Sequence, residues 1–131
     1  MLQELENLYA LCFPDKKTKW TKQDFLDLKN SGAEIIASQN SFIVWRNVFD
    51  EAELIIIGVA PAARRTGTAS ALLKIMEEDA KKSGVKKIFL EVAERNIPAK
   101  ALYEKNGYKQ IAIRKNYYED GDNAIIMNKG I

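Results

Sequence analysis

The residues with the clearest chemical potential lie between positions 64 and 69, where two arginines precede a glycine and a small residue. The stretch reads Arg64-Arg65-Thr66-Gly67-Thr68-Ala69. It falls between an expected strand and a long expected helix, so the N–H groups of the loop and of the first helical turn have no partner inside the helix. Such N–H groups, with two cationic side chains nearby, favour an anion such as a phosphate. A solvated basic turn with a glycine for helix entry explains the same residues equally well.

Composition excludes several other kinds of site. The chain has no histidine and a single cysteine, Cys12, so it lacks a Ser-His-Asp triad, a His-ligated metal and an internal disulfide. The loop has neither the Gly-Lys-[Ser/Thr] ending of a P-loop nor the three spaced glycines of a dinucleotide fingerprint. The 20 Lys and Arg residues are scattered among 18 Asp and Glu residues, for a net charge of +2, so we expect no direct nucleic-acid partner.

An Arg-x-x-Gly-x-Ala loop after a strand resembles the acetyl-CoA pyrophosphate loop of the GNAT superfamily of N-acetyltransferases. Further blocks follow in the order of that family: Val59-Ala60-Pro61, Leu90-Glu91-Val92, Asn96, Ala101-Leu102-Tyr103-Glu104 and Asn106-Gly107-Tyr108. The runs IRKNYY at 113–118 and DNAIIM at 122–127 are more particular. They resemble the RimI-type ribosomal-protein alanine N-acetyltransferases.

The resemblance implies a complete set of site residues. It implies that acetyl-CoA lies against residues of one strand, the loop and two helices: Ile57, Gly58, Val59, Arg64, Arg65, Thr66, Gly67, Thr68, Ala69, Ser70, Asn96 and Tyr103. It implies Glu91 as general base and Tyr103 as general acid. It implies that the acceptor peptide lies against the last strands and their loop, at Arg114, Asn116, Tyr117 and Tyr118. No metal ion is implied.

The two catalytic roles suit the chemistry of acetyl transfer. An N-terminal ammonium must lose a proton before its nitrogen attacks a thioester, and Glu91 can accept that proton directly or through water. We expect Glu91 to be partly buried, since removal from water makes a carboxylate hold a proton more firmly. Tyr103 can protonate the departing thiolate, and N–H groups near Val59 would polarise the acetyl carbonyl by about 2.7–4 kcal/mol per donor. Without the motif, Glu91 would be an ion-pair partner for Lys87 or Arg95.

The other residues also have structural explanations. Tyr103 can be a packing residue and Asn96 a helix cap. Tyr117 and Tyr118 can be a surface aromatic pair that shields the edge of the sheet. The joint order and spacing of these residues, rather than any one of them, favours the acetyltransferase interpretation.

The elements that must position these residues begin with two helices. Apolar residues at spacings of three and four predict a helix over about 2–13. Thr21 as N-cap with Asp24, an acidic variant of the capping box, predicts the start of a second helix, and Trp20 against Phe25 forms a hydrophobic staple. This second helix should end before the next glycine.

Strands and helices then alternate. We expect strands at 34–37, 42–45 and 54–59, a helix at 67–83, a strand at 87–92, a short helix between Asn96 and Asn106-Gly107, and strands at 108–113 and 124–127. The apolar stripe of the long helix should comprise Ala71, Leu72, Ile75, Met76 and Ala80. The strand at 87–92 is hydrophobic enough to predict a central position with helices over both faces.

The 131 residues and this order predict one α+β domain over 1–131, with the GNAT fold of a mostly antiparallel sheet, a parallel central pair and flanking helices. The family usually begins with a strand, whereas this sequence opens directly into a helix, so the sheet would lack its first strand. The acidic N-terminus is unlike a signal peptide, and the longest apolar stretch, 54–63, is too short to span a bilayer. We therefore expect a cytoplasmic protein with no membrane partner.

The sequence thus predicts an acetyl-CoA-dependent N-acetyltransferase that acts by direct transfer. Cys12 is disfavoured as an acetyl carrier because it lies on the apolar face of the first predicted helix. The resemblance implies the N-terminal alanine of small-subunit ribosomal protein 18 as the acceptor. Two alternatives remain: a GNAT enzyme for a lysine or a small-molecule amine, and a catalytically silent CoA-binding module.

Overall fold

The computed structural model describes residues 1–131 and begins with two helices, α1 (Leu2–Cys12) and α2 (Lys22–Asn30). The start of α2 follows the sequence prediction. Thr21 Oγ1 accepts a hydrogen bond from the Asp24 N–H, and an Asp24 carboxylate oxygen accepts one from the Thr21 N–H at 2.8 Å. Trp20 packs edge-on against Phe25, with ring centroids 5.4 Å apart. The capping box and the staple together define where α2 begins.

Six strands form one sheet in the order β1-β2-β3-β4-β6-β5. Their bounds are β1 (Ala33–Ala37), β2 (Ser41–Val48), β3 (Glu51–Val59), β4 (Lys87–Ala93), β5 (Lys109–Arg114) and β6 (Ala124–Gly130). All neighbours pair antiparallel except β3 and β4, which are parallel. The predicted mixed sheet with a parallel central pair is confirmed. Strands β2 and β3 extend beyond their predicted apolar runs, because polar residues continue the ladder to a tight turn at Phe49-Asp50.

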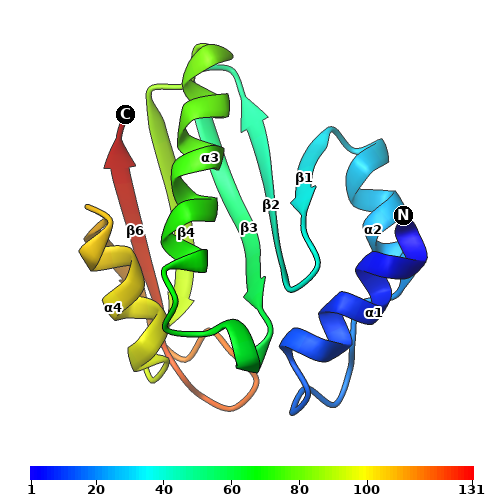
Figure 1. Cartoon of the computed structure of the whole chain (residues 1–131). Helices are drawn as coiled ribbons and strands as arrows, with labels where there is room; N and C mark the ends of the chain where they lie inside the picture. Colours follow the sequence, from blue (N-terminus) through cyan, green and yellow to red (C-terminus); the bar gives the residue numbers. More distant parts are fainter.

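Helices cover the two faces of the sheet unequally. The helices α3 (Thr68–Lys82) and α4 (Ile97–Lys105) lie in front of the sheet in Figure 1 and share one core with it. A second core joins α1 and α2 to the opposite face at β1 and β2. Strand β2 belongs to both, because Ile43 and Trp45 face α3 whereas Phe42 and Val44 face α1 and α2.

Short segments complete the fold. A 3₁₀ turn, η1 (Pro61–Ala63), follows β3 and was not predicted. The start of α4 is as predicted, since Asn96 Oδ1 accepts a hydrogen bond from the Ala99 N–H at 3.3 Å. The helix ends at Lys105 with Asn106 as its C-cap, and Gly107 follows with φ of 92°. None of the helices is both long enough and apolar enough to cross a membrane.

The predicted apolar stripe of α3 is partly wrong. The buried residues of this helix are Leu72, Leu73, Met76 and Ala80. Ala71 is exposed, and 46% of the Ile75 surface is exposed. The helix is rotated so that Leu73, which is fully buried, points into the core in their place. Burying Leu73 rather than Ala71 removes more apolar surface from water, and the buried residues keep a helical spacing.

The prediction that helices cover both faces of β4 is also wrong. Ile88, Leu90 and Val92 are buried in the core under α3 and α4. The residues between them point the other way, and there Phe89 is half-buried and Glu91 is exposed. The helices α1 and α2 pack over β1 and β2, so they leave this face of β4 uncovered. Apolar content alone did not distinguish this strand from one buried on both faces.

Candidate active site

The strands β3 and β4 pair only near their first residues. Residues 51–53 align with 87–89, and beyond these β3 continues to Val59 and β4 to Ala93 without pairing. In Figure 1 the two strands separate toward the end of the sheet at which α3 begins. Alternate residues of an unpaired strand edge direct their N–H and C=O groups outward. The end of β3, including residues 57–59, therefore offers backbone groups to the opening.

Gly58 lies where the backbone of β3 is pressed by aromatic rings. A Cβ atom on Gly58 would lie 2.5 Å from Cε1 of Phe42 and 3.0 Å from Cε2 of Phe13. Phe42 is fully buried in the core under α1 and α2, so its ring has no free space to move into. Aromatic packing thus holds the strand segment that borders the opening, and only glycine fits there.

The loop after β3 presents a run of unpaired backbone N–H groups. Those of residues 65–70 donate to no acceptor within the protein, and the first bond into α3 joins the Ala71 N–H to the Gly67 carbonyl at 3.0 Å. Arg65 and Gly67 both have positive φ, at 63° and 83°. Such a backbone makes a concave set of donors at the positive end of the α3 dipole, which suits an anion. The sequence predicts an anion site at this place.

Nearby hydroxyl groups shape this loop. Thr66 Oγ1 donates to the Ala63 carbonyl and lies 2.8 Å from Thr68 Oγ1. Ser70 Oγ accepts a hydrogen bond from Asn106 Nδ2 at 3.1 Å, which links the first turn of α3 to the end of α4. The threonine hydroxyls bond to the protein itself, whereas the Ser70 hydroxyl only accepts and keeps its proton to donate. The donors left for an anion are this hydroxyl and the main-chain N–H groups.

The two arginines of the loop have different surroundings. Arg64 donates from Nη2 to the Cys12 carbonyl at 2.7 Å and from Nε to the Val59 carbonyl at 3.2 Å. Arg65 makes neither a side-chain hydrogen bond nor an ion pair. The sequence assigns both residues to the cofactor, but only Arg65 has a free guanidinium group beside the unpaired N–H groups.

The phenol of Tyr103, near the C-terminal end of α4, lies in the core. Its side chain is 8% exposed, and its ring packs edge-on against Tyr108 with centroids 6.0 Å apart. Burial raises the pKa of Tyr103 to about 12, and the neighbouring Tyr118 adds to the effect. The hydroxyl therefore holds its proton at neutral pH, as a general acid must before it acts.

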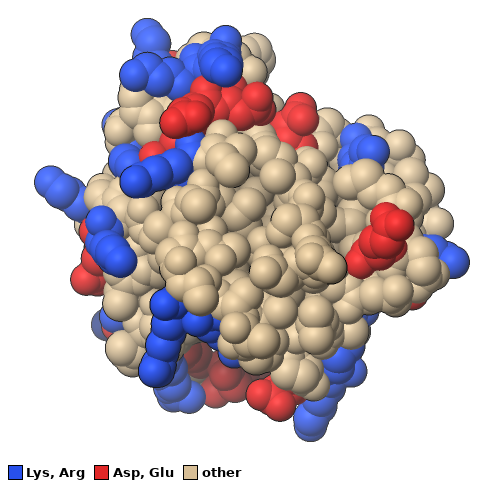
Figure 2. Space-filling view, in the orientation of Figure 1, with Lys and Arg blue, Asp and Glu red and all other residues tan.

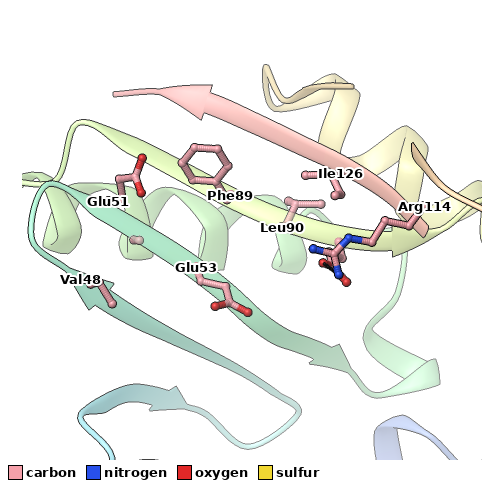
Figure 3. Close-up of a pocket in the computed structure, with 9 residues that line it drawn as sticks. Val48, Glu51, Glu53, Phe89, Leu90, Arg114 and Ile126 are labelled. Carbon is pink, nitrogen blue, oxygen red and sulfur yellow. Dashed lines mark ion pairs between the residues drawn. The ribbon is translucent and has the colours of Figure 1, made fainter. Parts of the chain in front are cut away.

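Glu91 lies on the uncovered face of β4, beside a pocket of about 330 Å³ that runs along β3 and β4. Figure 3 shows this pocket, with Arg114 reaching toward it from the end of β5. Glu91 Oε1 lies 3.6 Å from Arg114 Nη1, and the Glu91 side chain is 36% exposed. Its ionic partner is thus Arg114 rather than Lys87 or Arg95. The burial that we expected is limited, because a cation rather than an apolar wall stands opposite the carboxylate.

The loop between β5 and β6 brings two tyrosines to the same end of the pocket. The rings of Tyr117 and Tyr118 pack edge-on with centroids 5.2 Å apart, and the Arg114 guanidinium lies 5.3 Å from the Tyr117 ring centre. Burial and then the negative charge of Glu91 raise the pKa of Tyr118. The fold therefore gathers a carboxylate, a guanidinium and two phenols from two strands and one loop.

Two residues that hold this loop, Asp122 and Asn123, were named in the sequence analysis only as part of the run at 122–127 and were given no role. Asp122 is 5% exposed and accepts a hydrogen bond from the Arg95 N–H at 3.1 Å. Asn123 Oδ1 accepts from the Asn116 N–H at 2.9 Å, and its Nδ2 donates to Glu94 at 3.0 Å. They tie the loop to the connection between β4 and α4. Asp and Asn directly before an apolar strand often bond to nearby backbone, and that signal would have selected them.

Charged side chains lie mainly around the rim of the face shown in Figure 2, with both signs intermixed and a broad uncharged surface between them. This is the face that α3 and α4 cover. No continuous stripe of charges of one sign crosses this face, in keeping with the scattered charges of the sequence and the net charge of +2.

Comparison with known proteins gives the family of this fold and site. The model of the acetyltransferase (GNAT) family matches residues 2–108. The chain belongs to the GNAT family. A [ribosomal protein bS18]-alanine N-acetyltransferase of Haemophilus ducreyi is 32% identical over 136 residues, covering 95% of this chain and 92% of that protein. The protein of the same name from Escherichia coli K12 is 41% identical over 90 residues, covering 66% of this chain and 61% of that protein.

Solved structures agree with the GNAT assignment. The ribosomal-protein-S18-alanine N-acetyltransferase of Escherichia coli has a TM-score of 0.85 at 30% identity, covering 99% of this chain and 87% of that chain. Naa20 of Chaetomium thermophilum, solved with a bisubstrate analogue, has a TM-score of 0.84 at 22% identity, covering 100% of this chain and 84% of that chain. The second likeness concerns the fold alone. The predicted GNAT fold is confirmed.

As a GNAT acetyltransferase, the protein takes its acetyl group from acetyl-CoA, as predicted. The fold leaves no role for its one cysteine as an acetyl carrier. Cys12 is fully buried, and burial raises the pKa of its thiol to about 11. A thiol that is protonated and enclosed is a poor nucleophile.

Proposed function

We propose that this protein acetylates the N-terminal alanine of small-subunit ribosomal protein 18 by direct transfer from acetyl-CoA. One observation carries the proposal: unpaired N–H groups at residues 65–70 border an opening in the sheet whose other side holds Glu91. The choice of alanine rests on the named relatives from Haemophilus ducreyi and Escherichia coli. We also propose that residues 1–131 act as one domain in the cytoplasm, where ribosomal proteins are made.

The chain offers matching groups to each part of the donor. The N–H groups of residues 65–70 would bind the diphosphate, with added charge from Arg65. The outward groups of residues 57–59 would bind the pantetheine amides as a strand binds an added strand. Asn96 uses Oδ1 in its cap and keeps its amide N–H groups for the donor. Acetyl-CoA supplies a thioester that an amine can open.

Glu91 would take the proton from the N-terminal ammonium of the acceptor. It lies on the uncovered face of β4, where a peptide can reach it, and in the free protein it pairs with Arg114. The incoming ammonium would replace Arg114 at little cost, since a solvent-exposed ion pair contributes only about 0–1 kcal/mol. The neutral amine would then attack the acetyl carbonyl, forming the new N–C bond.

Tyr103 would protonate the sulfur as the C–S bond breaks. With a pKa of about 12, its hydroxyl keeps a proton available throughout the neutral range. The negative charge that develops on sulfur draws this proton, and the phenol recovers one from water. One N–C bond forms and one C–S bond breaks. The nitrogen loses two protons: the first passes from the ammonium to Glu91, and the second, lost as the amide forms, is released to water while Tyr103 protonates the sulfur.

The acceptor side would be formed by the residues around the loop between β5 and β6. Tyr117 and Tyr118 would pack against the first peptide residues, and Arg114 and Asn116 would set the edge of the cleft. A small first side chain such as alanine suits a cleft narrowed by two aromatic rings.

Transfer to a defined peptide tests the proposal. The purified protein is incubated with acetyl-CoA and a peptide that carries the N-terminus of ribosomal protein 18, and the products are measured by intact mass and fragmentation. We expect one acetyl group on the α-amino nitrogen and none on a peptide whose N-terminus is already blocked. Acetylation of internal lysines alone would overturn the alanine assignment.

A second experiment separates an enzyme from a silent CoA-binding module. The Glu91→Gln, Tyr103→Phe double variant should bind CoA like the wild type but lose at least about 100-fold in turnover, because both proton transfers are removed. CoA binding is measured by calorimetry and turnover by release of free thiol. If wild type and variant turn over equally slowly, the protein is not an enzyme.

A further inference from the structure

Arg64 occupies a junction between three elements of the fold. It begins the loop that leads to α3, yet its guanidinium group bonds to the carbonyl of Cys12 at the end of α1 and to that of Val59 at the end of β3. The last turn of α1 contains no basic residue of its own. Arg64, which is 52 residues away, thus supplies the cation that favours a helix C-terminus.

The end of α1 also borders the opening between β3 and β4. Phe13 follows α1 directly, and its ring lies so close to Gly58 that a Cβ there would be 3.0 Å away. If the end of α1 moved, Phe13 would leave the strand segment that borders the opening. The bonds of Arg64 to Cys12 and Val59 hold these two segments at a fixed separation.

We propose that Arg64 is a positioning residue that ties the end of α1 to the end of β3 and so fixes the width of the opening between β3 and β4. Its part in acetyl transfer rests on the proposed function, whereas its part in holding α1 does not. Arg65 is the arginine that contributes charge to the anion site. The two adjacent arginines therefore have separate tasks.

The variants Arg64→Gln and Arg65→Gln form a matched pair, because the same change is made at neighbouring positions. Calorimetric titration with CoA should show about tenfold weaker binding for Arg65→Gln, in line with the loss of one charged hydrogen bond, and near wild-type binding for Arg64→Gln. Weaker CoA binding by Arg64→Gln than by Arg65→Gln would show that Arg64 is the phosphate ligand and would overturn the proposal.

The rate at which a thiol reagent labels Cys12 tests whether Arg64 holds the end of α1 to the end of β3, and it requires no measurement of enzyme activity. Cys12 is the only cysteine and is fully buried, so a thiol reagent reaches it only when the end of α1 opens. We expect labelling about tenfold faster in Arg64→Gln than in the wild type or in Arg65→Gln. Because the charge of Arg64 lowers the pKa of Cys12, its loss alone would slow labelling. Equal rates in all three proteins would overturn the proposal.

Steady-state kinetics and a conservative variant complete the test. Arg64→Gln should lower kcat several-fold with little change in KM for acetyl-CoA, because the end of β3 no longer holds the thioester in place while the diphosphate still binds. Arg65→Gln should instead raise KM for acetyl-CoA. Arg64→Lys keeps the charge but lacks the planar guanidinium group that bonds both carbonyls, so it should restore labelling protection and kcat only in part. A rise in acetyl-CoA KM alone for Arg64→Gln would refute the tie. If the wild type acetylates no peptide, the proposed function fails, while labelling and CoA titration still decide the role of Arg64.

Discussion

Tyr103 and Glu91 are both ionisable, but the fold gives them opposite surroundings. Tyr103 is 8% exposed under the layer of α3 and α4, whereas Glu91 lies on the other face of the sheet beside Arg114. Burial keeps a phenol protonated, and an uncovered carboxylate is accessible to an incoming cation. Proton donor and proton acceptor thus face the reaction from opposite sides of the sheet.

Stability at high pH should report the burial of Tyr103. Its folded pKa of about 12 exceeds the value of about 10 for an unfolded tyrosine, so its contribution is complete below pH 10 and is lost as pH rises from 10 to 12. Over this window the free energy of unfolding should fall by about 2–3 kcal/mol on account of Tyr103. Urea unfolding of the wild type and of Tyr103→Phe at several pH values measures this. An identical alkaline slope in both proteins would contradict it.

At the scale of elements, the two glycines that flank α3 permit a controlled test of the anion site. Gly67 and Gly84 both have φ near 85°, at 83° and 88°, and a Cβ at either would meet nothing within 4 Å. Alanine at either position should therefore cost about 1–2 kcal/mol of stability through backbone strain. Only Gly67→Ala should also weaken CoA binding, since its methyl group lies at the unpaired N–H groups.

Thermal unfolding and CoA titration of both glycine variants check this prediction. We expect similar losses in stability and a difference of about tenfold or more in CoA affinity, equivalent to roughly 1.4 kcal/mol. Equal CoA affinity in the two variants would show that the start of α3 does not bind the donor.

The loop between β5 and β6 depends on one amide side chain. Asn123→Ala removes the acceptor for the Asn116 N–H and the bond to Glu94, while the backbone bond from the Glu94 N–H to the Asn123 carbonyl remains. We expect a loss of about 1–2 kcal/mol in stability and a several-fold rise in acceptor KM, with CoA affinity unchanged. Asn123→Asp keeps the acceptor but faces Glu94 with a like charge, so its effect should be intermediate. A change in CoA affinity alone would argue against this role.

Local patterns predicted α2 well and α3 less well, for a physical reason. The start of α2 depends on neighbours in sequence, Thr21 with Asp24 and Trp20 with Phe25, so its signal is local. The orientation of α3 depends on the sheet beneath it, because the predicted stripe and the observed buried face both have helical spacing and spacing alone does not choose between them. The sequence pattern therefore gave the helix but not its rotation.

In the candidate site, too, some features depend on neighbours in sequence and others on residues far away in the chain. The loop at residues 65–70 lies where the sequence predicts it, because a glycine between a strand and a helix is a local signal. The direction of the Arg64 side chain depends on α1, and the ion pair of Glu91 depends on Arg114 in β5. No spacing rule within a short window contains those partners.

At the scale of the whole molecule, one strand joins two cores. Strand β2 contributes alternate residues to the core under α3 and to the core under α1 and α2, and each core has its own tryptophan, Trp45 in the first and Trp20 packed against the second. Because β2 cannot leave one core and stay in the other, both should unfold together.

Two single-tryptophan variants test this coupling. Trp20→Phe leaves Trp45 as the reporter, and Trp45→Phe leaves Trp20. In each variant the fluorescence transition in urea should coincide with the transition in far-UV circular dichroism. An earlier Trp20 transition would show that α1 and α2 unfold separately from the rest of the sheet.

Because β3 and β4 pair over so few residues, a small tilt of one half of the sheet against the other displaces the far end of β3. Only residues 51–53 and 87–89 join its two halves, and β3 extends six residues past this junction to Val59, about 20 Å at 3.3 Å per residue. A tilt of about 5° between the halves would therefore move the far end by nearly 2 Å, about a third of the usual separation of neighbouring strands. The helix α3 packs on both halves of the sheet and so limits this tilt. Small adjustments in its packing are thus converted into large changes in the width of the opening.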